Sequence, residues 1–405
     1  MLLESYHVHL SEKLTRSNYL LTILLIQVVQ SIKEVTLESI ATKLGMPIKF
    51  ESRRKKVQRF LSDNEWDLDD IWLSLVIDWI KGSVKQNEII HIAIDRTKWQ
   101  SNNILMVSMI WRKRAIPIYW KMLDKQASRR SRAAGNSTLE NQQSVLTPVF
   151  TALSDYSLVV LGDREFCAGR VTRHASVTLA NWLREQKVGF CLRLKKNVCI
   201  KTEEELWTEL KMLGLEPGNS FFNQEVAIRK TAPIEGFNLA GKWLGKYRNI
   251  TTKEPWYILT SLADLQAAVD AYAKRFGIEE MFRDFKGGGY NLEKTNLTGD
   301  RLSNLLILLS LAYLKSIIQG IEIKSKQVQE YLGRKTESHR KYARHSTFYI
   351  GLWGESWVDS MSSNWQVVVE LMSLSPHKLP NYQQGLRAMR LILSALQHFP
   401  AIWST

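Results

Sequence analysis

Apolar residues recur at spacings of three and four along residues 1–88, and this pattern predicts a helical N-terminal region. Thr36 is placed to cap a helix that ends at Gly45, and Ser52 is placed to begin a second helix. The cations of the second helix are Arg53, Arg54, Lys55, Lys56 and Arg59. A short helix, a glycine turn and a basic helix are typical of a helix-turn-helix DNA reader, but also of a bundle with a solvated basic face. Both interpretations stay open on the pattern alone.

From Glu88 onward the pattern changes to alternation and β-branched residues. Three segments, IIHIAIDRT, NILMVSMIWR and AIPIYWKML, predict an antiparallel meander. A polar, basic loop follows over 125–144. Helices and strands then alternate: a helix near 140–154, a buried strand in SLVVLGDREF, a helix over 177–187 and a strand in GFCLRLKKN. Three antiparallel strands followed by alternating elements are the order of a ribonuclease-H-like α/β domain.

Composition narrows the class of partner. The chain has 405 residues, 55 of them basic and 40 acidic, which gives a formal charge of +15 and a pI near 9.6. Such a surface attracts polyanions, and nucleic acid is the leading candidate. The three cysteines form no Cys-x-x-Cys pair, which argues against a zinc ribbon. The apolar runs at 19–26 and 305–314 are too short to span a bilayer, so we expect buried helices in a soluble, intracellular protein without a membrane partner.

The stretch AYAKRFGIEEMFRDFKGG, residues 271–288, predicts one amphipathic helix with an unusual polar stripe. At helical spacing, four side chains fall within a fan only about 60° wide. They are Tyr272, Arg275, Glu279 and Lys286. A separate apolar face is left for the core, and Glu280 and Asp284 point away from the stripe, where we expect surface pairs. A hydroxyl, two cations and a carboxylate on one edge indicate the wall of a site that binds both metal and an anion.

Two further acids suit such a site. Asp95 is predicted to end the first strand and Asp163 to end the fourth, so each carboxylate emerges from an apolar segment. Either residue alone is explained as a turn aspartate. Together with Glu279 they predict a site for two divalent cations about 4 Å apart, the arrangement used in phosphodiester displacement. Oxygen ligands favour Mg²⁺ or Mn²⁺ over zinc.

The three acids, with the spacing Tyr272-x2-Arg275-x3-Glu279-x6-Lys286, resemble the DDE triad and the Tyr-Arg-Glu-Lys signature of bacterial insertion-sequence transposases of the cut-and-paste, hairpin-forming type. The resemblance is strongest at EPWYILTSL and IEEMFRDFK. The interval from Asp163 to Glu279 exceeds what one strand and one helix need, and family members carry a β-rich insertion there. The predicted domains are therefore a helical N-terminal DNA-binding domain at 1–88, a catalytic core at 89–199 and 256–318, a β-rich insertion at 200–255 and a helical C-terminal region at 319–405.

The resemblance also implies roles for single residues. Asp95, Asp163 and Glu279 would bind two Mg²⁺ or Mn²⁺ ions. The residues implied to hold DNA phosphates are Tyr272, Arg275, Lys286, Arg193 and Lys195. Trp256 matches the family tryptophan that stacks on a base flipped from the transposon end, although a core tryptophan at a strand start is the simpler interpretation. For Arg193 and Lys195, an ordinary basic strand end remains the alternative.

The implied reaction begins with nicking of double-stranded DNA at the transposon end. The freed 3′ hydroxyl would then form a hairpin, which is hydrolysed before strand transfer into target DNA. A homodimer that pairs two ends, in the bacterial cytoplasm and associated with the nucleoid, is a further expectation from the family. Two alternatives use the same scaffold: a metal-dependent nuclease without strand transfer, and a catalytically silent DNA-binding inhibitor of transposition.

Overall fold

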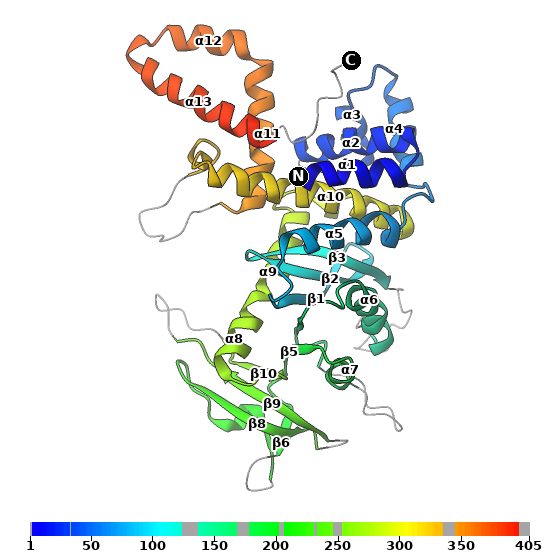
Figure 1. The fold of residues 1–405 in the computed structure, drawn as a ribbon, viewed down its shortest axis with the longest axis vertical. Helices are drawn as coiled ribbons and strands as arrows, with labels where there is room; N and C mark the ends of the chain where they lie inside the picture. Colours follow the sequence, from blue (N-terminus) through cyan, green and yellow to red (C-terminus); the bar gives the residue numbers. More distant parts are fainter. Residues whose placement is uncertain are drawn as a thin grey trace. The chain divides into compact units, whose positions relative to one another are not determined.

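The computed structural model describes residues 2–32, 34–123, 137–167, 178–201, 206–230, 233–245, 253–334 and 345–396 (Figure 1). The chain divides into two compact units, which are described separately below. We call Ile77–Arg283 the sheet unit, and Met1–Val76 together with Asp284–Thr405 the helical unit. Most of the basic loop predicted at 125–144 lies outside the described residues.

The sheet unit is built on a single mixed sheet in its described part. The strands are β1 (Ile90–Trp99), β2 (Asn102–Trp111), β3 (Arg114–Leu123), β4 (Leu158–Gly162), β5 (Gly189–Arg193), β6 (Cys199–Lys201), β7 (Trp207–Glu209), β8 (Ser220–Ile228), β9 (Ile234–Lys242) and β10 (Trp256–Thr260). Their order across the sheet is β3-β2-β1-β4-β5-β10-β9-β8-β6-β7. β1 to β3 form an antiparallel meander, β4 pairs parallel with β1 and β5 parallel with β4, and β10 runs antiparallel to both β5 and β9. This mixed α/β arrangement is consistent with the predicted ribonuclease-H-like fold.

The prediction that Asp95 ends the first strand is wrong. β1 pairs with β4 only as far as Ile94, but it continues against β2 to Trp99. The longer strand is stabilised by Thr97 and Trp99, whose side chains are buried. Asp95 therefore lies in the middle of β1, at the point where the strand loses its second neighbour.

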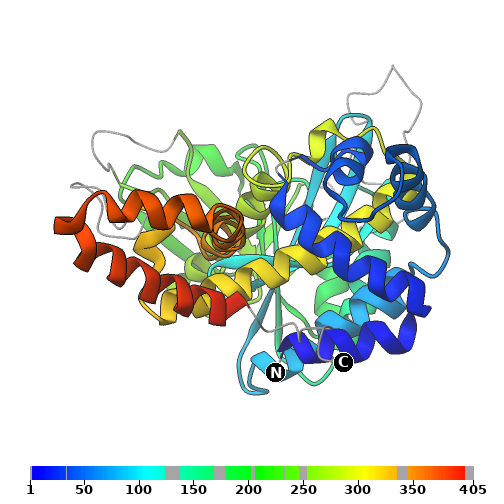
Figure 2. The ribbon, with the colours of Figure 1, turned by 90° about the horizontal axis from the view of Figure 1, so that it is seen from above.

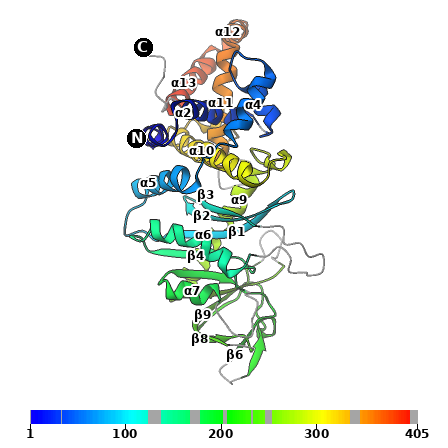
Figure 3. The same ribbon diagram turned by 90° about the vertical axis from the view of Figure 1, so that its right-hand side faces the viewer.

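Helices cover the sheet of this unit. They are α6 (Leu139–Ala152), α7 (Leu179–Glu185), the 3₁₀ turn η2 (Leu210–Leu213) and α8 (Leu265–Lys274), while α5 (Ser74–Ser83) and α9 (Phe276–Phe285) cross its boundaries. Figure 3 shows α6 along the meander strands, where it packs against β2 and β3. A cluster of buried residues from β4, β5, β9, β10 and α8, including Leu161 and Tyr272, forms a core beneath α8.

The single helix predicted over 271–288 is instead two helices, α8 and α9, which meet at Arg275. The Arg275 N–H donates to the Tyr272 carbonyl and the Ile278 N–H to the Arg275 carbonyl, each at 3.0 Å, so the chain tightens to three-residue bonding there. Gly277 follows, at a point where an added Cβ would lie 3.1 Å from Ile110 Cδ1. The break therefore coincides with the close approach of the chain to the β2–β3 hairpin.

The helical unit is assembled around one long helix. Its elements are α1 (Leu2–Lys13), α2 (Arg16–Ser31), α3 (Leu37–Lys43), α4 (Phe50–Phe60), the π-helix η1 (Leu68–Leu73), η3 (Leu292–Lys294), α10 (Gly299–Ser325), η4 (Gln329–Tyr331), α11 (Thr347–Ser363), α12 (Trp365–Ser373), η5 (Pro376–Lys378) and α13 (Leu379–Leu396). Figure 2 shows α10 (yellow) beside α2 (blue), and α10 also packs against α11. By length and composition α10 is apolar enough to cross a membrane, but 83% of its apolar window is buried inside the protein, which is the environment of a core helix.

Candidate active site

Two strands bring the first two acids together. The parallel register of β1 and β4 places Ile94 beside Gly162, so Asp95 and Asp163 follow at adjacent positions where the pairing ends. The Arg96 N–H donates to Asp95 Oδ1 at 2.7 Å, which fixes one carboxylate oxygen. Asp95 is 20% exposed and Asp163 is 38% exposed, so both carboxylates are accessible from outside.

Arg275 joins Asp95 to the third acid. Its Nη1 lies 3.3 Å from Asp95 Oδ2, and its Nη2 donates to Glu279 Oε1 in a short hydrogen bond. The arginine side chain is only 4% exposed, whereas Glu279 is 48% exposed. Its Nε is buried and has no hydrogen-bond partner among the described residues. Arg275 therefore acts as an internal cation that bridges two carboxylates from β1 and α9.

Asp163 is bound by a second pair of side chains. The Tyr272 hydroxyl donates to Asp163 Oδ1 at 3.3 Å, and Arg193 Nη1 lies 3.9 Å from the same oxygen. Tyr272 is 1% exposed, and its ring meets Trp256 edge-on at a centroid distance of 5.1 Å. The ring of the half-buried Trp256 also lies 6.2 Å from that of Phe276, which is exposed. The structure thus gathers Asp95, Asp163, Arg193, Tyr272, Arg275 and Glu279, with Trp256 packed against the tyrosine.

Burial controls the protonation of this cluster. It raises the pKa of Asp95 to about 6, and the nearby Asp163 and Glu279 act in the same direction, against the lowering effect of Arg275. Burial also raises the pKa of Tyr272 to about 12, so its hydroxyl stays a hydrogen-bond donor. For Arg275 burial alone would lower the pKa, but the surrounding Tyr272 and carboxylates raise it above its ordinary value. The arginine is a permanent cation, and Asp95 exchanges its proton near neutral pH.

The donor chemistry of the site fits Mg²⁺ or Mn²⁺, because its described residues offer three carboxylates and no thiol or imidazole ligand. The side chains do not converge on an ion as they stand: among the described residues no three His, Cys, Asp or Glu side chains are grouped closely enough to hold one. Arg275 engages Asp95 and Glu279, and Tyr272 engages Asp163. Metal binding at these carboxylates therefore requires a rearrangement of these side chains.

Two other predicted phosphate ligands have surroundings of their own. Lys286 follows the end of α9 and belongs to the helical unit, where its ammonium lies 3.5 Å from Glu293. Lys195 is exposed beyond the end of β5, next to Lys196, which pairs with Glu254 at 3.5 Å. Asp284 was expected on the surface, but it is buried and accepts a hydrogen bond from Tyr313 at 3.3 Å. Glu280 forms the expected surface pair with Arg283, at 3.7 Å.

The basic helix near the N-terminus is α4, and it begins at Phe50 rather than at Ser52. Arg53 is not free for DNA in this structure, because its guanidinium donates to the carbonyls of Ala41 and Ile48, each at 2.8 Å, and closes the turn between α3 and α4. Arg54 lies 3.7 Å from Glu51. The remaining predicted cations are Lys55, Lys56 and Arg59; the last two line a pocket of about 280 Å³ with Ser52 and Asp63.

Sequence reasoning missed a clamp beside the acids. The Arg96 guanidinium binds both carboxylate oxygens of Glu165, with Nε 2.9 Å from each. Arg96 follows Asp95 in the chain and Glu165 lies two residues after Asp163, so the pair ties together the two segments that carry the acids. Ser137 donates to the same Glu165 from its N–H at 2.9 Å. The opposite charges beside two predicted site residues were the available signal.

Residues 123–315 match the family model described as the transposase DDE domain. The matched range contains Asp163 and Glu279, while Asp95 lies before it. No curated protein matches the chain. The match supports a DDE transposase, a class of metal-dependent enzymes that act on DNA.

Proposed function

We propose that this protein is a DNA transposase that binds the ends of its mobile element, cleaves them and joins the 3′ ends to target DNA. The observation that carries the proposal is the clustering of Asp95, Asp163 and Glu279 around Arg275 and Tyr272. Side chains from three segments that lie far apart in the sequence, at Asp95, at Asp163 and at residues 272–279, are brought into hydrogen bonds and ion pairs within one unit. A buried, charged cluster with open carboxylates is expensive for stability, and such clusters mark functional sites.

In this proposal Asp95, Asp163 and Glu279 hold two Mg²⁺ or Mn²⁺ ions. When bound, such ions activate a water or a 3′ hydroxyl and stabilise the departing oxygen in phosphodiester displacement. The protein's own contribution is positional: the Arg96–Glu165 clamp fixes the two strand segments, and Tyr272 orients the Asp163 carboxylate. Arg275 holds Asp95 and Glu279 in place as an internal cation.

A released Arg275 has a phosphate as its natural partner, because a guanidinium binds phosphate oxygens through a planar fork. Lys286, Arg193 and Lys195 are proposed as further phosphate contacts, and Trp256 as the stacking surface for a flipped base. Tyr272 contacts the DNA backbone only if its hydroxyl leaves Asp163, since it is buried in this structure. The charge of +15 draws the DNA to the protein at low salt.

The remaining features of the proposal rest on the family resemblance. The second strand is cut through a hairpin, a homodimer pairs the two transposon ends, and the protein works in the bacterial cytoplasm at the nucleoid. Residues 53–59 contribute to end binding through Lys55, Lys56 and Arg59. Arg53 is left out of this set, because its guanidinium is bonded to backbone carbonyls.

The experiment that tests the function uses linear DNA that carries the element's own ends, with Mg²⁺. It compares the native protein with Glu279→Gln. Glu280→Gln is the matched control: it makes the same chemical change one residue away, at a carboxylate that pairs with Arg114 and Arg283 rather than with Arg275. We expect a released flank, hairpin ends and joined products from the native protein and the control, and none from Glu279→Gln.

The two alternatives give different results. Cleavage without any joined product identifies a nuclease. Tight, salt-sensitive binding without cleavage by any variant, in Mg²⁺ or Mn²⁺, identifies a silent DNA-binding protein and removes the catalytic assignment of the three acids. Equal cleavage by Glu279→Gln and the native protein would falsify the role of Glu279.

A further inference from the structure

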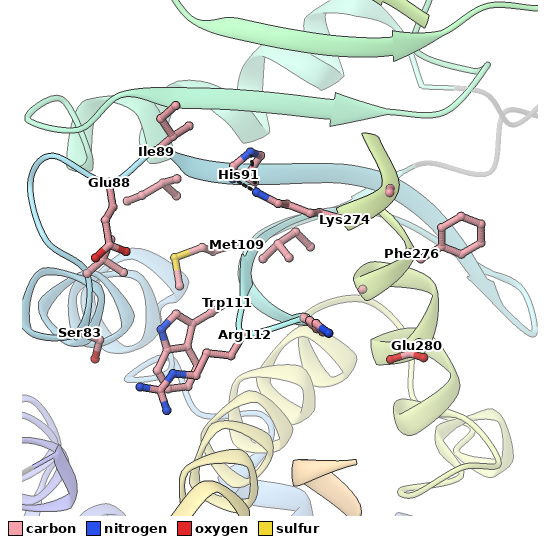
Figure 4. A pocket seen from close by; sticks show the side chains of 16 residues that line it. Ser83, Glu88, Ile89, His91, Met109, Trp111, Arg112, Lys274, Phe276 and Glu280 are labelled. Atoms are coloured by element: carbon pink, nitrogen blue, oxygen red, sulfur yellow. Dashed lines mark hydrogen bonds between the residues drawn. The ribbon is translucent and has the colours of Figure 1, made fainter. Parts of the chain in front are cut away.

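The sheet unit contains a second site candidate, a pocket of about 790 Å³ (Figure 4). It lies between the start of β1, the β2–β3 turn and the junction of α8 with α9. Its volume falls within the range of roughly 300 to 1,000 Å³ that ligand pockets occupy. The wall combines apolar side chains with cations, among them Ile89, Ile110, Trp111, Arg112, Lys113 and Lys274. The residues from 83 to 113 in this wall precede the part of the chain that matches the transposase domain.

The positive charges in the pocket are not balanced by the protein. Within the described part of the chain, no ion pair is found for Arg112, Lys113 or Lys274. The Lys274 ammonium lies 3.2 Å from Nε2 of His91. Burial lowers the pKa of His91 to about 4, so the ring is neutral and adds no charge to the pocket. Three cations thus face a shared space.

Two acidic residues, Glu88 and Glu280, also line the pocket. Glu280 is neutralised by Arg114 at 3.2 Å and by Arg283 at 3.7 Å. Glu88 lies beside Ile89, away from Phe276 and Glu280 (Figure 4). An anionic group is therefore expected beside Arg112, Lys113 or Lys274 rather than beside Glu88.

The backbone of the β2–β3 turn indicates that its cations serve a purpose. Arg112 and Lys113 are the two residues between the strands, with φ of 46° and 69°. Two-residue hairpin turns with positive φ at both positions favour Asn and Gly, because other residues are strained there. An Arg–Lys pair at these positions costs stability, and such costs are retained where function requires the side chains.

One cation also forms a flat platform. The Arg112 guanidinium carbon lies 4.8 Å from the centroid of the Trp111 ring, and the ring of Trp79 meets that indole edge-on at a centroid distance of 4.9 Å. The tryptophan is thereby held in place beneath the guanidinium. Nucleobases stack on aromatic rings and on guanidinium planes, and the phosphates beside them bind cations.

We propose that this pocket binds a nucleotide unit, with its phosphate at Arg112, Lys113 and Lys274 and its base on the Arg112–Trp111 platform. The ligand is either a free mononucleotide or one nucleotide of a single-stranded DNA segment. The site is separate from the carboxylate cluster in its residues, and its ligand needs no divalent ion. Its occupation can therefore be measured with EDTA present, whether or not the protein cleaves DNA.

The test compares two substitutions that are matched in charge and in backbone strain. Lys113→Gly removes a cation of the pocket at φ 69°, and Lys187→Gly removes an exposed cation outside it at φ 57°. Glycine relieves the backbone at both positions, so neither melting temperature should fall. Affinity is measured in EDTA by calorimetry for dAMP and by fluorescence anisotropy for a labelled single-stranded hexanucleotide.

We expect Lys113→Gly to weaken binding about tenfold, as the loss of one phosphate contact does, and Arg112→Asn/Lys113→Gly to weaken it further, while Lys187→Gly stays within about twofold of the native protein. Dependence on Lys113 for dAMP alone identifies a free nucleotide as the ligand, and dependence for the hexanucleotide identifies a strand. Equal affinities for the two matched variants overturn the proposal. Inorganic phosphate or an acidic peptide that competes as well as dAMP overturns it too, because the base would then play no part.

Discussion

Arg275 in the sheet unit and Lys315 in the helical unit are both buried cations with acidic partners, and the two differ in what surrounds them. Arg275 of the sheet unit is 4% exposed and binds Asp95 and Glu279, which are 20% and 48% exposed. Lys315 of the helical unit is 2% exposed, and its ammonium lies 2.6 Å from Gln30 Oε1 and 3.6 Å from Glu355, which is only 18% exposed. One cation has partners that solvent can reach. The other is enclosed with its partners.

Lys315 is part of a buried network of side-chain hydrogen bonds. Gln30 also donates to Ser316 at 2.9 Å and to Gln319 at 3.2 Å, so helices α2 and α10 are joined by side-chain bonds through their buried faces. Arg275 instead leaves its own Nε without a partner among the described residues, and its acids have oxygens to spare. A buried cation therefore indicates a site when its partners are open, and a structural bond when they are closed.

We call the acids around Arg275, which solvent can reach, the open cluster: Asp95, Asp163 and Glu279. The largest expected effect tests this cluster through Asp95→Asn. The amide keeps the shape of the side chain but is a poor ligand for a divalent ion, so DNA cleavage should fall about a thousandfold or more, on the order of 4 kcal/mol in activation free energy. Cleavage is measured under single-turnover conditions with Mg²⁺. Thermal melting should stay close to that of the native protein. Full cleavage by this variant would exclude Asp95 from the metal site.

We call the enclosed contacts of Lys315 with Gln30 and Glu355 the closed network. The next largest effect tests this network through Lys315→Met. Removing the cation leaves Glu355 and Gln30 without their partner inside the protein, and breaking a buried pair in this way costs about 3 kcal/mol or more. The free energy of unfolding is measured with urea. In the double variant Lys315→Met/Glu355→Gln part of this loss should return, because no uncompensated charge remains. A loss below about 1 kcal/mol would show that the lysine is not a structural bond.

A smaller effect separates the two cations directly. Arg275→Met frees Asp95 and Glu279, so Mg²⁺ no longer competes with an internal cation and should bind about tenfold more tightly, or about 1.4 kcal/mol. Binding is measured by calorimetry without DNA. Lys315→Met is the control and should leave the Mg²⁺ affinity of the protein unchanged. Weaker binding to Arg275→Met would mean that the arginine helps to build the ion site rather than occupying it.

The sequence was sufficient for elements with a clear period and for acids near strand ends. The strands of the meander lie where the apolar, β-branched segments IIHIAIDRT, NILMVSMIWR and AIPIYWKML predict them, and the middle of β2 is buried on both faces. Asp95 and Asp163 meet because parallel pairing of two apolar segments brings their ends to one edge of the sheet. The end of β1 was misplaced, since pairing with β2 alone sustains the strand for several residues beyond Asp95.

Contacts between distant residues account for what the sequence missed. A helical wheel assumes an unbroken helix, but the chain tightens at Arg275, beside the glycine that meets the β2–β3 hairpin. Composition marks Arg53 as a surface cation, yet two backbone carbonyls at a turn claim its guanidinium. Likewise, the polar stripe of the predicted helix does not indicate that the Tyr272 side chain is buried and that its hydroxyl donates a hydrogen bond to Asp163. Each of these depends on a partner that no local pattern identifies.

The smallest effect concerns pH and again sets the open cluster apart. Burial raises the pKa of Asp95 to about 6 in the native protein, above its ordinary value of 3.8, so the native state binds this proton more tightly than the unfolded chain. The free energy of unfolding therefore rises as pH falls through 6 and stops rising below the unfolded value. Without divalent ions, the native protein should gain about 1 kcal/mol between pH 7 and pH 5 relative to Asp95→Asn.

Urea unfolding of both proteins in EDTA at the two pH values measures this difference. Excess Mg²⁺ should reduce or reverse the gain, because the ion requires the ionised carboxylate and stabilises the protein most above pH 6. Parallel pH profiles for the native protein and Asp95→Asn would mean that the carboxylate of Asp95 is already solvated, and the open cluster would then lose its only group that titrates near neutral pH.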